Sequence, residues 1–383
     1  MNPTGVYVHI PFCRHKCLYC DFNSYAGQQA LFAPYLDAVQ REIAMRAGLL
    51  TAPERRAVQT LYVGGGTPTA LPAGDLIALL QTAQKMFALA SGSEITVEAN
   101  PGTISLEGLA ALRAAGVNRL SLGVQSFADA MLTSLGRIHS GREARQAVRN
   151  ARAAGFDNLS LDLMFGLPTQ TLADWQVDVE IALSLAPEHL SLYALTVEQE
   201  TPLAARIRAG TLPEPDDDLA ADMYAWVEAR LDAAGYGHYE ISNWARPGFE
   251  CRHNLIYWRN QPYLGLGAGA HGWWKGKRRA NVAHPERYIA AIQVGQSPID
   301  WEESIDRPLE MGETMMMGLR LLEEGVIYAR FEARFGDSLE AIYGNEIADL
   351  IEQGLLERTS QGIRLSAAGH LLGNLVFARF LSG

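Results

Sequence analysis

The amino-acid sequence predicts an α/β protein whose main part is a partial (β/α)6 barrel of the TIM-like kind. In the first 240 residues, short runs rich in β-branched and aliphatic residues alternate with amphipathic runs of helical length. Six of these short runs are present, and several end in glycine or polar residues. Strands separated by helices pair in parallel, and the carboxyl ends of such strands form the functional face of a barrel.

The predicted elements of the barrel follow one another in a regular order. Strands are expected at residues 5–10, 57–66, 94–101, 117–126, 156–168 and 187–195. Helices are expected at residues 31–50, 74–87, 106–116, about 128–154 and 172–185. A Pro- and Asp-rich break at 211–218 then precedes one further helix at about 219–234.

The last part of the chain has a different pattern. A stretch rich in Trp, Tyr and Gly covers about 236–275, and helical runs without long strands begin near residue 306. Residues 354–380 indicate two short strands and a closing helix, which is typical of a winged helix. We therefore expect a barrel at 1–240, a connecting region at 241–300 and a mostly helical, winged-helix-like domain at 301–383.

Composition narrows the class of protein. The net charge of −11 argues against a broad basic surface for nucleic acid. The start MNPTGVYVHIPFC lacks the regions of a signal peptide, and no apolar run reaches the roughly 18 residues of a membrane span. Four cysteines, three of them clustered, favour a reducing compartment. We expect a cytoplasmic protein, and this composition is compatible with peripheral contact at the inner membrane face.

Three cysteines lie within eight residues in the run CRHKCLYC. Cys13, Cys17 and Cys20 have C-x3-C-x2-C spacing and follow the first predicted strand. A structural zinc site needs four ligands in two pairs, and no second pair lies downstream, so zinc is the weaker interpretation. A [4Fe–4S] cluster takes one thiolate per iron. Three thiolates would leave one iron free to bind a substrate or cofactor.

These residues resemble the radical SAM superfamily, in which the open iron of the cluster binds S-adenosylmethionine (SAM). The runs YVHIPFC and GGGTPT are similar to the branch that contains oxygen-independent coproporphyrinogen III oxidase. The resemblance implies a partial barrel of the radical SAM type, with the three cysteines as metal ligands. Glycines allow a backbone to approach a ligand closely. By resemblance, Gly65, Gly66 and Thr67 contact the methionine moiety of SAM.

Polar side chains also occur at or near the ends of otherwise apolar strands. Glu98, Gln125 and Asp162 are of this kind, and a buried polar group needs either a ligand or a hydrogen-bond partner. Arg137 could neutralise a carboxylate or form a surface ion pair. The resemblance implies SAM binding at all four positions, and Tyr7 matches a tyrosine near the cluster. It also implies one-electron chemistry fed by a reductant such as flavodoxin or ferredoxin, without a catalytic side chain.

Two features separate the chain from the oxidase. Phe22 occupies the position of a fourth cysteine in the oxidase motif, and an N-terminal extension is lacking. The run HNLIYW at 253–258 resembles a motif of the HemW-type haem chaperones, which implies haem ligation by His253. Read without this resemblance, His253 is more simply a capping residue beside packed aromatic rings.

The resemblance therefore implies a haem chaperone that carries a SAM-ligated [4Fe–4S] cluster and transfers haem to acceptor proteins of respiration. The alternative is oxygen-independent oxidative decarboxylation of coproporphyrinogen III through a 5′-deoxyadenosyl radical. A radical methyltransferase or haem-modifying enzyme is a third, weaker reading. Whether the chain cleaves SAM and whether it forms a dimer are left open. The role of Cys251 is also open: it is either a small buried hydrophobic residue or a second haem ligand. Residues 273–279 are either a solvated loop or a contact for haem propionates or for an anionic membrane.

Overall fold

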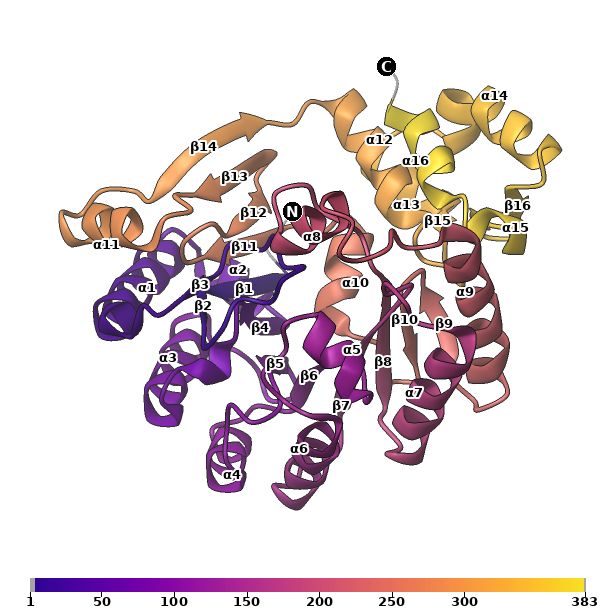
Figure 1. The fold of residues 1–383 in the computed structure, drawn as a ribbon. Coiled ribbons are helices and arrows are strands. Elements are labelled where there is room, and N and C mark those ends of the chain that lie inside the picture. Colours follow the sequence, from indigo (N-terminus) through magenta and orange to yellow (C-terminus); the bar gives the residue numbers. More distant parts are fainter. Residues whose placement is uncertain (1–3, 382–383) are drawn as a thin grey trace.

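A single curved sheet forms the centre of the molecule, which is a computed structural model that describes residues 4–381 (Figure 1). The six predicted strands are present and pair in parallel in chain order. They are β1 (Gly5–Ile10), β4 (Thr60–Gly65), β5 (Glu94–Ala99), β6 (Arg119–Gln125), β7 (Leu159–Phe165) and β8 (His189–Ala194). The predicted α/β class and (β/α) unit order are therefore confirmed.

The sheet continues beyond both ends of this parallel part. On one side follow β11 (Tyr263–Leu266), parallel to β1, and then the antiparallel strands β12 (His271–Trp274), β13 (Lys277–Asn281) and β14 (Ile299–Ser304). On the other side lie β10 (Asn243–Ala245) and β9 (Gly237–Glu240), both antiparallel. Across residues 4–381 the sheet thus has twelve strands and two edges, so the barrel stays open. Residues 241–300 supply β10 to β13 and the start of β14 to this sheet, and the predicted boundaries at 240 and 300 stay a prediction.

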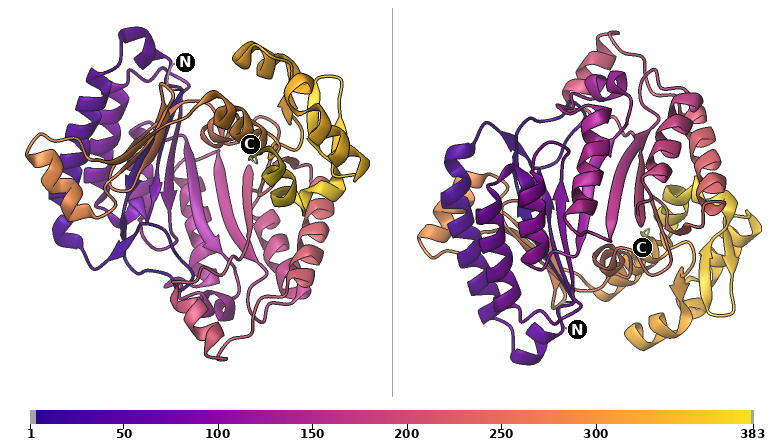
Figure 2. Two further views of the ribbon diagram at one scale, coloured as in Figure 1. Left: turned by 90° about the horizontal axis from the view of Figure 1, so that it is seen from above. Right: turned by 90° about the horizontal axis from the view of Figure 1, so that it is seen from below.

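Helices cover the outer face of the curved sheet (Figures 1 and 2). The longer ones are α1 (Phe32–Gly48), α3 (Ala73–Met86), α4 (Leu106–Ala114), α6 (Gly141–Ala153), α7 (Leu172–Ser184) and α9 (Asp217–Asp232). Shorter helices are η1 (Gln29–Leu31), α2 (Ala52–Arg56), η2 (Pro68–Ala70), α5 (Asp129–Ser134), α8 (Pro202–Arg208) and α11 (Pro285–Gln293). Within the described part of the chain, none of the helices joins the length and the apolar character that crossing a membrane requires.

Local sequence explains where several of these helices begin. Ser140 and Glu143 form a capping box at the start of α6, and Thr171 and Asp174 form one at the start of α7. Each box satisfies backbone N–H groups that have no partner within the helix. The short strands β2 (Phe12–Cys13) and β3 (Tyr25–Ala26) pair in parallel with each other and form a separate two-stranded sheet.

The main core lies between the sheet and its outer helices. The parallel strands alternate: apolar side chains point toward the outer helices, and polar ones such as Tyr62, Glu98 and Asp162 point toward the inner face. Val8, Leu61 and Leu161 on the strands and Leu79 on α3 are fully or almost fully buried, as is Trp175 on α7. Burying each such side chain stabilises the fold by roughly 1.5–3 kcal/mol. This core holds the strand ends in place, and with them the loops at the carboxyl edge of the sheet.

The chain ends in a second, mostly helical unit with its own core, as predicted. It contains α12 (Arg307–Gly318), α13 (Tyr328–Phe335), α14 (Leu339–Glu352), α15 (Ala367–His370) and α16 (Gly373–Leu381). Its small sheet consists of β15 (Val326–Ile327), β17 (Gly362–Leu365) and β16 (Leu356–Arg358) in that order. The two predicted strands and the closing helix are β16, β17 and α16. Met315, Phe331 and Ile347 are buried at the centre of this unit.

One short helix, α10 (Arg252–Trp258), lies across the starts of the barrel strands. Its first backbone N–H groups donate to the carboxylate of Glu94 at the start of β5, from Arg252 over 3.0 Å and from His253 over 2.9 Å. The His253 ring lies against Thr60 at the start of β4. Helix α10 therefore forms a floor at the end of the sheet opposite the cysteine loop.

Candidate functional site

The three cysteines lie together at the carboxyl edge of the sheet. Cys13 ends β2, and the loop that follows carries Cys17 and Cys20 before β3 closes it. All three are half-buried free thiols, and they line one cavity of about 480 Å³. The Thr67 hydroxyl donates to Cys13 Sγ over 3.6 Å, and the Arg137 guanidinium donates to Cys17 Sγ over 3.4 Å.

These donors have a chemical consequence for the thiols. Burial raises the pKa of Cys13 and of Cys20, so these two thiols stay protonated until a metal replaces the proton. Hydrogen bonds from Thr67 and Arg137 stabilise negative charge on sulfur once it develops. Three soft thiolates at the mouth of a cavity are the donor set of an iron–sulfur cluster, so the residues present fit that group.

The glycine run after β4 packs closely against the cysteine loop. Gly66 N–H donates to Ile10 O over 2.8 Å, and a Cβ on Gly66 would lie 2.7 Å from Phe12 O. Gly65 has φ +112°, and a Cβ there would meet the ring of His9 at 2.4 Å. Both glycines line the cavity. Contacts within the protein thus already require glycine at both positions, in addition to the approach of a ligand that the sequence suggested.

Two buried carboxylates face the same cavity. Glu98 on β5 accepts hydrogen bonds from the Tyr62 hydroxyl over 2.7 Å and from Gly65 N–H over 3.0 Å. Asp162 on β7 accepts from the Ser121 hydroxyl over 3.0 Å. Burial raises the pKa of Glu98 to about 7 and that of Asp162 to about 6. Protein surrounds both groups, and the cavity gives a ligand access to them.

Gln125 and Arg137 complete the wall of the cavity beside the cysteines. Gln125 is a left-handed residue with φ +67°, at an irregularity in the pairing of β6 with β7. Such strain in a residue other than glycine is typical of functional sites. The Arg137 guanidinium donates to Asn100 Oδ1 over 2.7 Å and to Gly123 O over 2.5 Å. Arg137 thus links the cysteine loop to two strand ends.

Several lining residues were missed by the sequence reasoning. They include Tyr62, Asn100, Arg119, Ser121, Ser191 and Asn254. Arg119 is the clearest case, since its side chain is 1% exposed and it borders the cavity at the start of β6. A charged residue in an apolar strand was the available signal. The predicted site residues lie at or near the ends of strands, whereas Arg119 begins β6.

Tyr7 and His253 lie behind the cavity and are absent from its lining. The Tyr7 hydroxyl bonds to His9 Nδ1 over 2.9 Å, and His9 Nε2 donates to Asn23 O over 2.8 Å. Tyr7 thus orients the histidine that packs under Gly65.

His253 is 1% exposed, and both of its ring nitrogens have partners. These are the Thr60 hydroxyl at 2.7 Å from Nδ1 and the Tyr257 hydroxyl at 2.8 Å from Nε2. Burial lowers the pKa of His253 to about 3, so the ring is neutral. The imidazole also stacks on Tyr62 with 5.1 Å between ring centres. In this arrangement His253 supports the floor, and ligation of haem iron would require one ring nitrogen to lose its partner.

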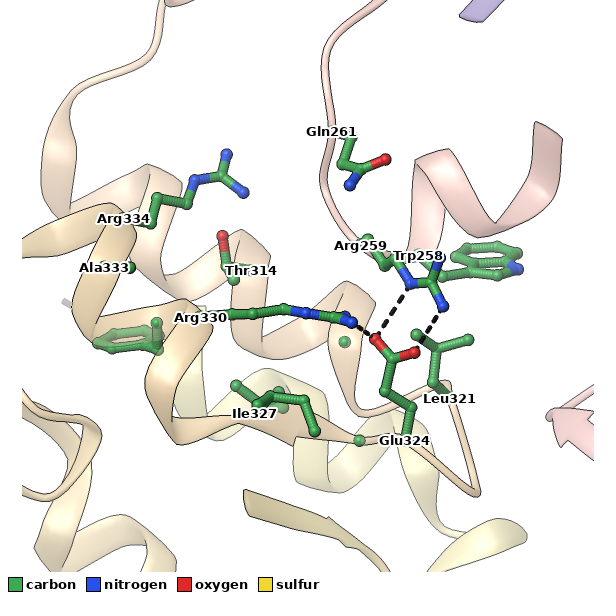
Figure 3. A pocket seen from close by; sticks show the side chains of 14 residues that line it. Trp258, Arg259, Gln261, Thr314, Leu321, Glu324, Ile327, Arg330, Ala333 and Arg334 are labelled. Atoms are coloured by element: carbon green, nitrogen blue, oxygen red, sulfur yellow. Dashed lines mark hydrogen bonds and ion pairs between the residues drawn. The ribbon is translucent and has the colours of Figure 1, made fainter. Parts of the chain in front are cut away.

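A second cavity, of about 470 Å³, is lined by Trp258 at the end of α10 and by residues of α12, of α13 and of the segment between them (Figure 3). Trp258 from the HNLIYW run borders it, together with apolar side chains such as Leu321 and Ile327. Glu324 pairs there with Arg259, 2.6 Å from Nη2, and with Arg330. The cavity is thus apolar inside and carries guanidinium groups at its border.

The two features that the sequence left open have structural explanations. Cys251 is fully buried, 3.8 Å from Glu94 Oε1, and burial raises the pKa of its thiol to about 12. Residues 273–279 are the end of β12, the turn at 275–276 and the start of β13, which form one hairpin. Its tryptophans, Trp273 and Trp274, are buried. Its cations pair with acidic partners: Lys275 with Glu54, Lys277 and Arg279 with Glu302, and Arg278 with Glu303 and Glu313. These pairs leave little unbalanced positive charge.

The model of the radical SAM superfamily matches residues 7–182, and the HemN C-terminal domain matches residues 305–372. The chain is 41% identical to the heme chaperone HemW of Bacillus subtilis (strain 168), over 98% of this chain and 99% of that protein. It is 37% identical to the heme chaperone HemW of Escherichia coli (strain K12), over 100% of this chain and 99% of that one.

Among solved structures, coproporphyrinogen III oxidase (HemN) from Escherichia coli, described as a radical SAM enzyme, superposes with a TM-score of 0.85. The alignment has 25% identity and covers 100% of this chain and 90% of the oxidase. The oxidase therefore shares the fold, whereas the chaperones share more of the sequence over the whole length. The chain belongs to the HemW family within the radical SAM superfamily.

Proposed function

We propose that this protein is a haem chaperone that holds a [4Fe–4S] cluster with bound SAM, binds haem and passes it to haem-accepting proteins. The observation that carries the proposal is the similarity to chaperones named HemW over almost the entire chain. The cavity with three free thiols supports it, because it offers a place for a cluster with one open iron.

The proposed cluster ligands are Cys13, Cys17 and Cys20. The proposed SAM contacts surround the same cavity: Gly65, Gly66, Thr67, Glu98, Gln125, Arg137 and Asp162, with Tyr7 behind them. A cluster and SAM would together supply one-electron cleavage of a carbon–sulfur bond. The protein's own residues have other tasks. Carboxylates and amides can accept hydrogen bonds from ribose hydroxyls and an amino group, and Arg137 holds the cysteine loop against the strand ends.

For haem, helix α10 offers two different surfaces. His253 is the proposed iron ligand, and its use would require the Tyr257 or Thr60 hydroxyl to move away. The second cavity beside Trp258 has the size and the apolar interior for a macrocycle. At its border Arg330 is paired with Glu324 and Arg334 with Glu310, and binding of propionates would require these guanidinium groups to exchange their carboxylate partners. We propose that haem lies in this cavity and that α10 rearranges for ligation.

The test is a Soret titration of cluster-loaded, full-length protein with haem. Saturable binding supports the proposal, and absence of saturation contradicts it. A His253→Ala variant should shift the Soret maximum, whereas an Arg330→Glu variant should weaken binding and leave the maximum in place. A parallel anaerobic assay with coproporphyrinogen III tests the alternative, since conversion to the decarboxylated product would favour an oxidase.

Four further expectations are independent of this proposal. They are a flavodoxin- or ferredoxin-like reductant, dimer formation, a cytoplasmic location and peripheral contact with the inner membrane face. The paired cations of the hairpin at 273–279 argue against using that hairpin as a basic membrane anchor.

A further inference from the structure

A cluster of three metal-ligating side chains lies outside the lining of the cofactor cavity, where the barrel meets the C-terminal unit. Glu228 comes from α9, His238 from β9 and His370 from the end of α15, elements that lie together in Figure 1. Their ligand atoms all lie within 4.8 Å of one another. We infer that this cluster, the domain-joint cluster, binds a divalent transition-metal ion such as Zn²⁺.

The surroundings of His238 determine where its ring proton lies. Its Nε2 is 3.2 Å from Ile241 O, and a carbonyl oxygen can only accept a hydrogen bond. The Tyr224 hydroxyl is 3.4 Å from the same nitrogen and donates its own hydrogen to Ile241 O over 2.9 Å. Nε2 therefore carries the hydrogen. The ring is held flat against Trp244, with 3.9 Å between ring centres and an angle of 11°.

This proton position leaves Nδ1 of a neutral His238 as a bare lone pair. Nδ1 faces Glu228 Oε1 over 3.1 Å, and a carboxylate oxygen is also an acceptor. Two lone pairs at this distance repel each other unless a metal ion or a proton lies between them. Metal-binding histidines commonly donate their second ring N–H to a carbonyl, as His238 does to Ile241, which orients the ligating nitrogen.

The third member completes a ligand set that zinc accepts. His370 Nδ1 lies 2.8 Å from the same Glu228 oxygen. Two histidines and one carboxylate form a known type of zinc site, and bonds of about 2.0–2.2 Å place the ligand atoms of a tetrahedral ion roughly 3.3 Å apart. The two spacings to Glu228 need shifts of a few tenths of an ångström, and the two histidine nitrogens lie within 4.8 Å of each other. All three side chains are partly exposed, so a water molecule can reach the fourth position.

The position of the cluster indicates what the ion does. Strand β9 already joins the two units, because Glu240 pairs with Arg320 and Leu322 N–H donates to Tyr239 O over 3.1 Å. His370 reaches the same strand from the other side of the C-terminal unit. A metal ion bound by groups from α9, β9 and α15 would cross-link the barrel to this unit and hold them in one arrangement.

The experiment uses tag-free, full-length protein with its iron–sulfur cluster loaded, so that the three cluster thiolates are not free to take zinc. Zinc is added, and the amount retained against a chromogenic chelator is measured by elemental analysis. We expect one Zn²⁺ per chain with unchanged iron content. His370→Ala and Glu228→Gln should each weaken zinc binding by more than the roughly 10- to 100-fold typical of changes beyond the ligands. His271→Ala, an exposed histidine elsewhere, is the matched control and should bind zinc normally.

A second measurement keeps the test valid if one variant folds poorly. Zinc should raise the unfolding temperature of the unchanged protein and of His271→Ala, and have no such effect on Glu228→Gln, because only a folded site gains from the ligand. The inference is overturned if the unchanged protein retains no zinc, or if His370→Ala and Glu228→Gln retain as much. In the first case a proton on His238 explains the contact, as an imidazolium–carboxylate pair.

Discussion

The two ends of the cofactor cavity differ in how well their polar groups are satisfied. At the mouth, the cysteine sulfur atoms take part only in long, weak hydrogen bonds, from 3.4 Å at Cys17 to 3.9 Å at Cys20. At the floor, His253 has three partners within 2.7–2.9 Å, two at its ring and one at its backbone. Groups whose strongest partner is missing are available to a ligand, whereas satisfied groups are scaffold. The groups at the mouth are thus available to bind a ligand, whereas those at the floor stabilise the fold.

The largest expected effect tests the mouth. Cys17→Ser should abolish assembly of the iron–sulfur cluster, because three thiolates are the minimum that the proposed site provides. Iron content and the visible absorption of the reconstituted protein measure this. Cys251→Ala is the control, since Cys251 is buried beside the floor and should leave the cluster intact. A Cys17→Ser protein with full iron content would contradict the assignment.

The next effect tests the floor. Glu94→Gln removes the charge that receives two backbone N–H groups of α10 and lies near Arg119. We expect the free energy of unfolding to fall by about 2–4 kcal/mol, the range for a charged hydrogen-bonded group in the interior. Urea denaturation measures it. Arg230→Ala removes an exposed pair with Glu180 and should change the midpoint little. If both substitutions lowered the free energy of unfolding equally, the floor would be no more important for stability than an exposed ion pair.

A smaller effect concerns the carboxylates between mouth and floor. The pKa of Glu98 is about 7 in the folded protein, against roughly 4.3 in an unfolded chain. Between these values the folded state binds more protons than the unfolded state, so stability falls as pH rises and levels off above about pH 7. We expect a slope of the order of 1 kcal/mol per pH unit.

Urea denaturation of the unloaded protein at pH 5, 6 and 7 measures this slope. Glu98→Gln should flatten it, and Asp162, with a pKa of about 6, should account for part of what is left. Glu180→Gln, an exposed control, should keep the original slope. A Glu98→Gln protein with the full slope would show that this carboxylate is already ionised in the folded state.

The smallest expected effect tests whether His253 at the floor can become a haem ligand. Tyr257→Phe removes the hydroxyl that bonds to His253 Nε2. We expect a stability loss of about 1 kcal/mol and, if His253 ligates iron, a roughly fivefold gain in haem affinity, since the nitrogen no longer has to break a bond. Soret titration measures the gain. An unchanged affinity would place His253 in the scaffold alone, and binding would then depend on the second cavity.

Hydrophobic periodicity and the spacing of the elements predicted most of the barrel correctly. The strand predicted at 5–10 is found at the same residues, and the helix predicted at 172–185 is found at 172–184. These elements depend on contacts among neighbouring residues, which a local pattern records. The cysteine loop was equally visible, because three ligands in eight residues need no long-range information.

Other elements depend on partners far along the chain. Strands β11–β14 were not predicted, because their pairing partners lie on β1 and on one another rather than in a repeated β–α pattern. Arg119 and Glu94 are single charges within apolar runs of the sequence, and only the fold brings α10 to Glu94 across 159 positions. The HNLIYW motif was recognised, but its role as a floor could not be, since a motif does not state which partners its atoms find.

The sequence alone therefore determined the alternating barrel, the three clustered thiols and the motifs of the family, all of which are encoded within short windows. The tertiary structure alone decided which polar groups are satisfied and which are open. In the folded chain both ring nitrogens of His253 have hydrogen-bond partners, whereas the thiols of the cysteine loop have only weak ones. The fold also brings Glu228, His238 and His370 together from three separate elements. Hydrogen-bond satisfaction depends on distance in space, and distance in space is a property of the folded chain.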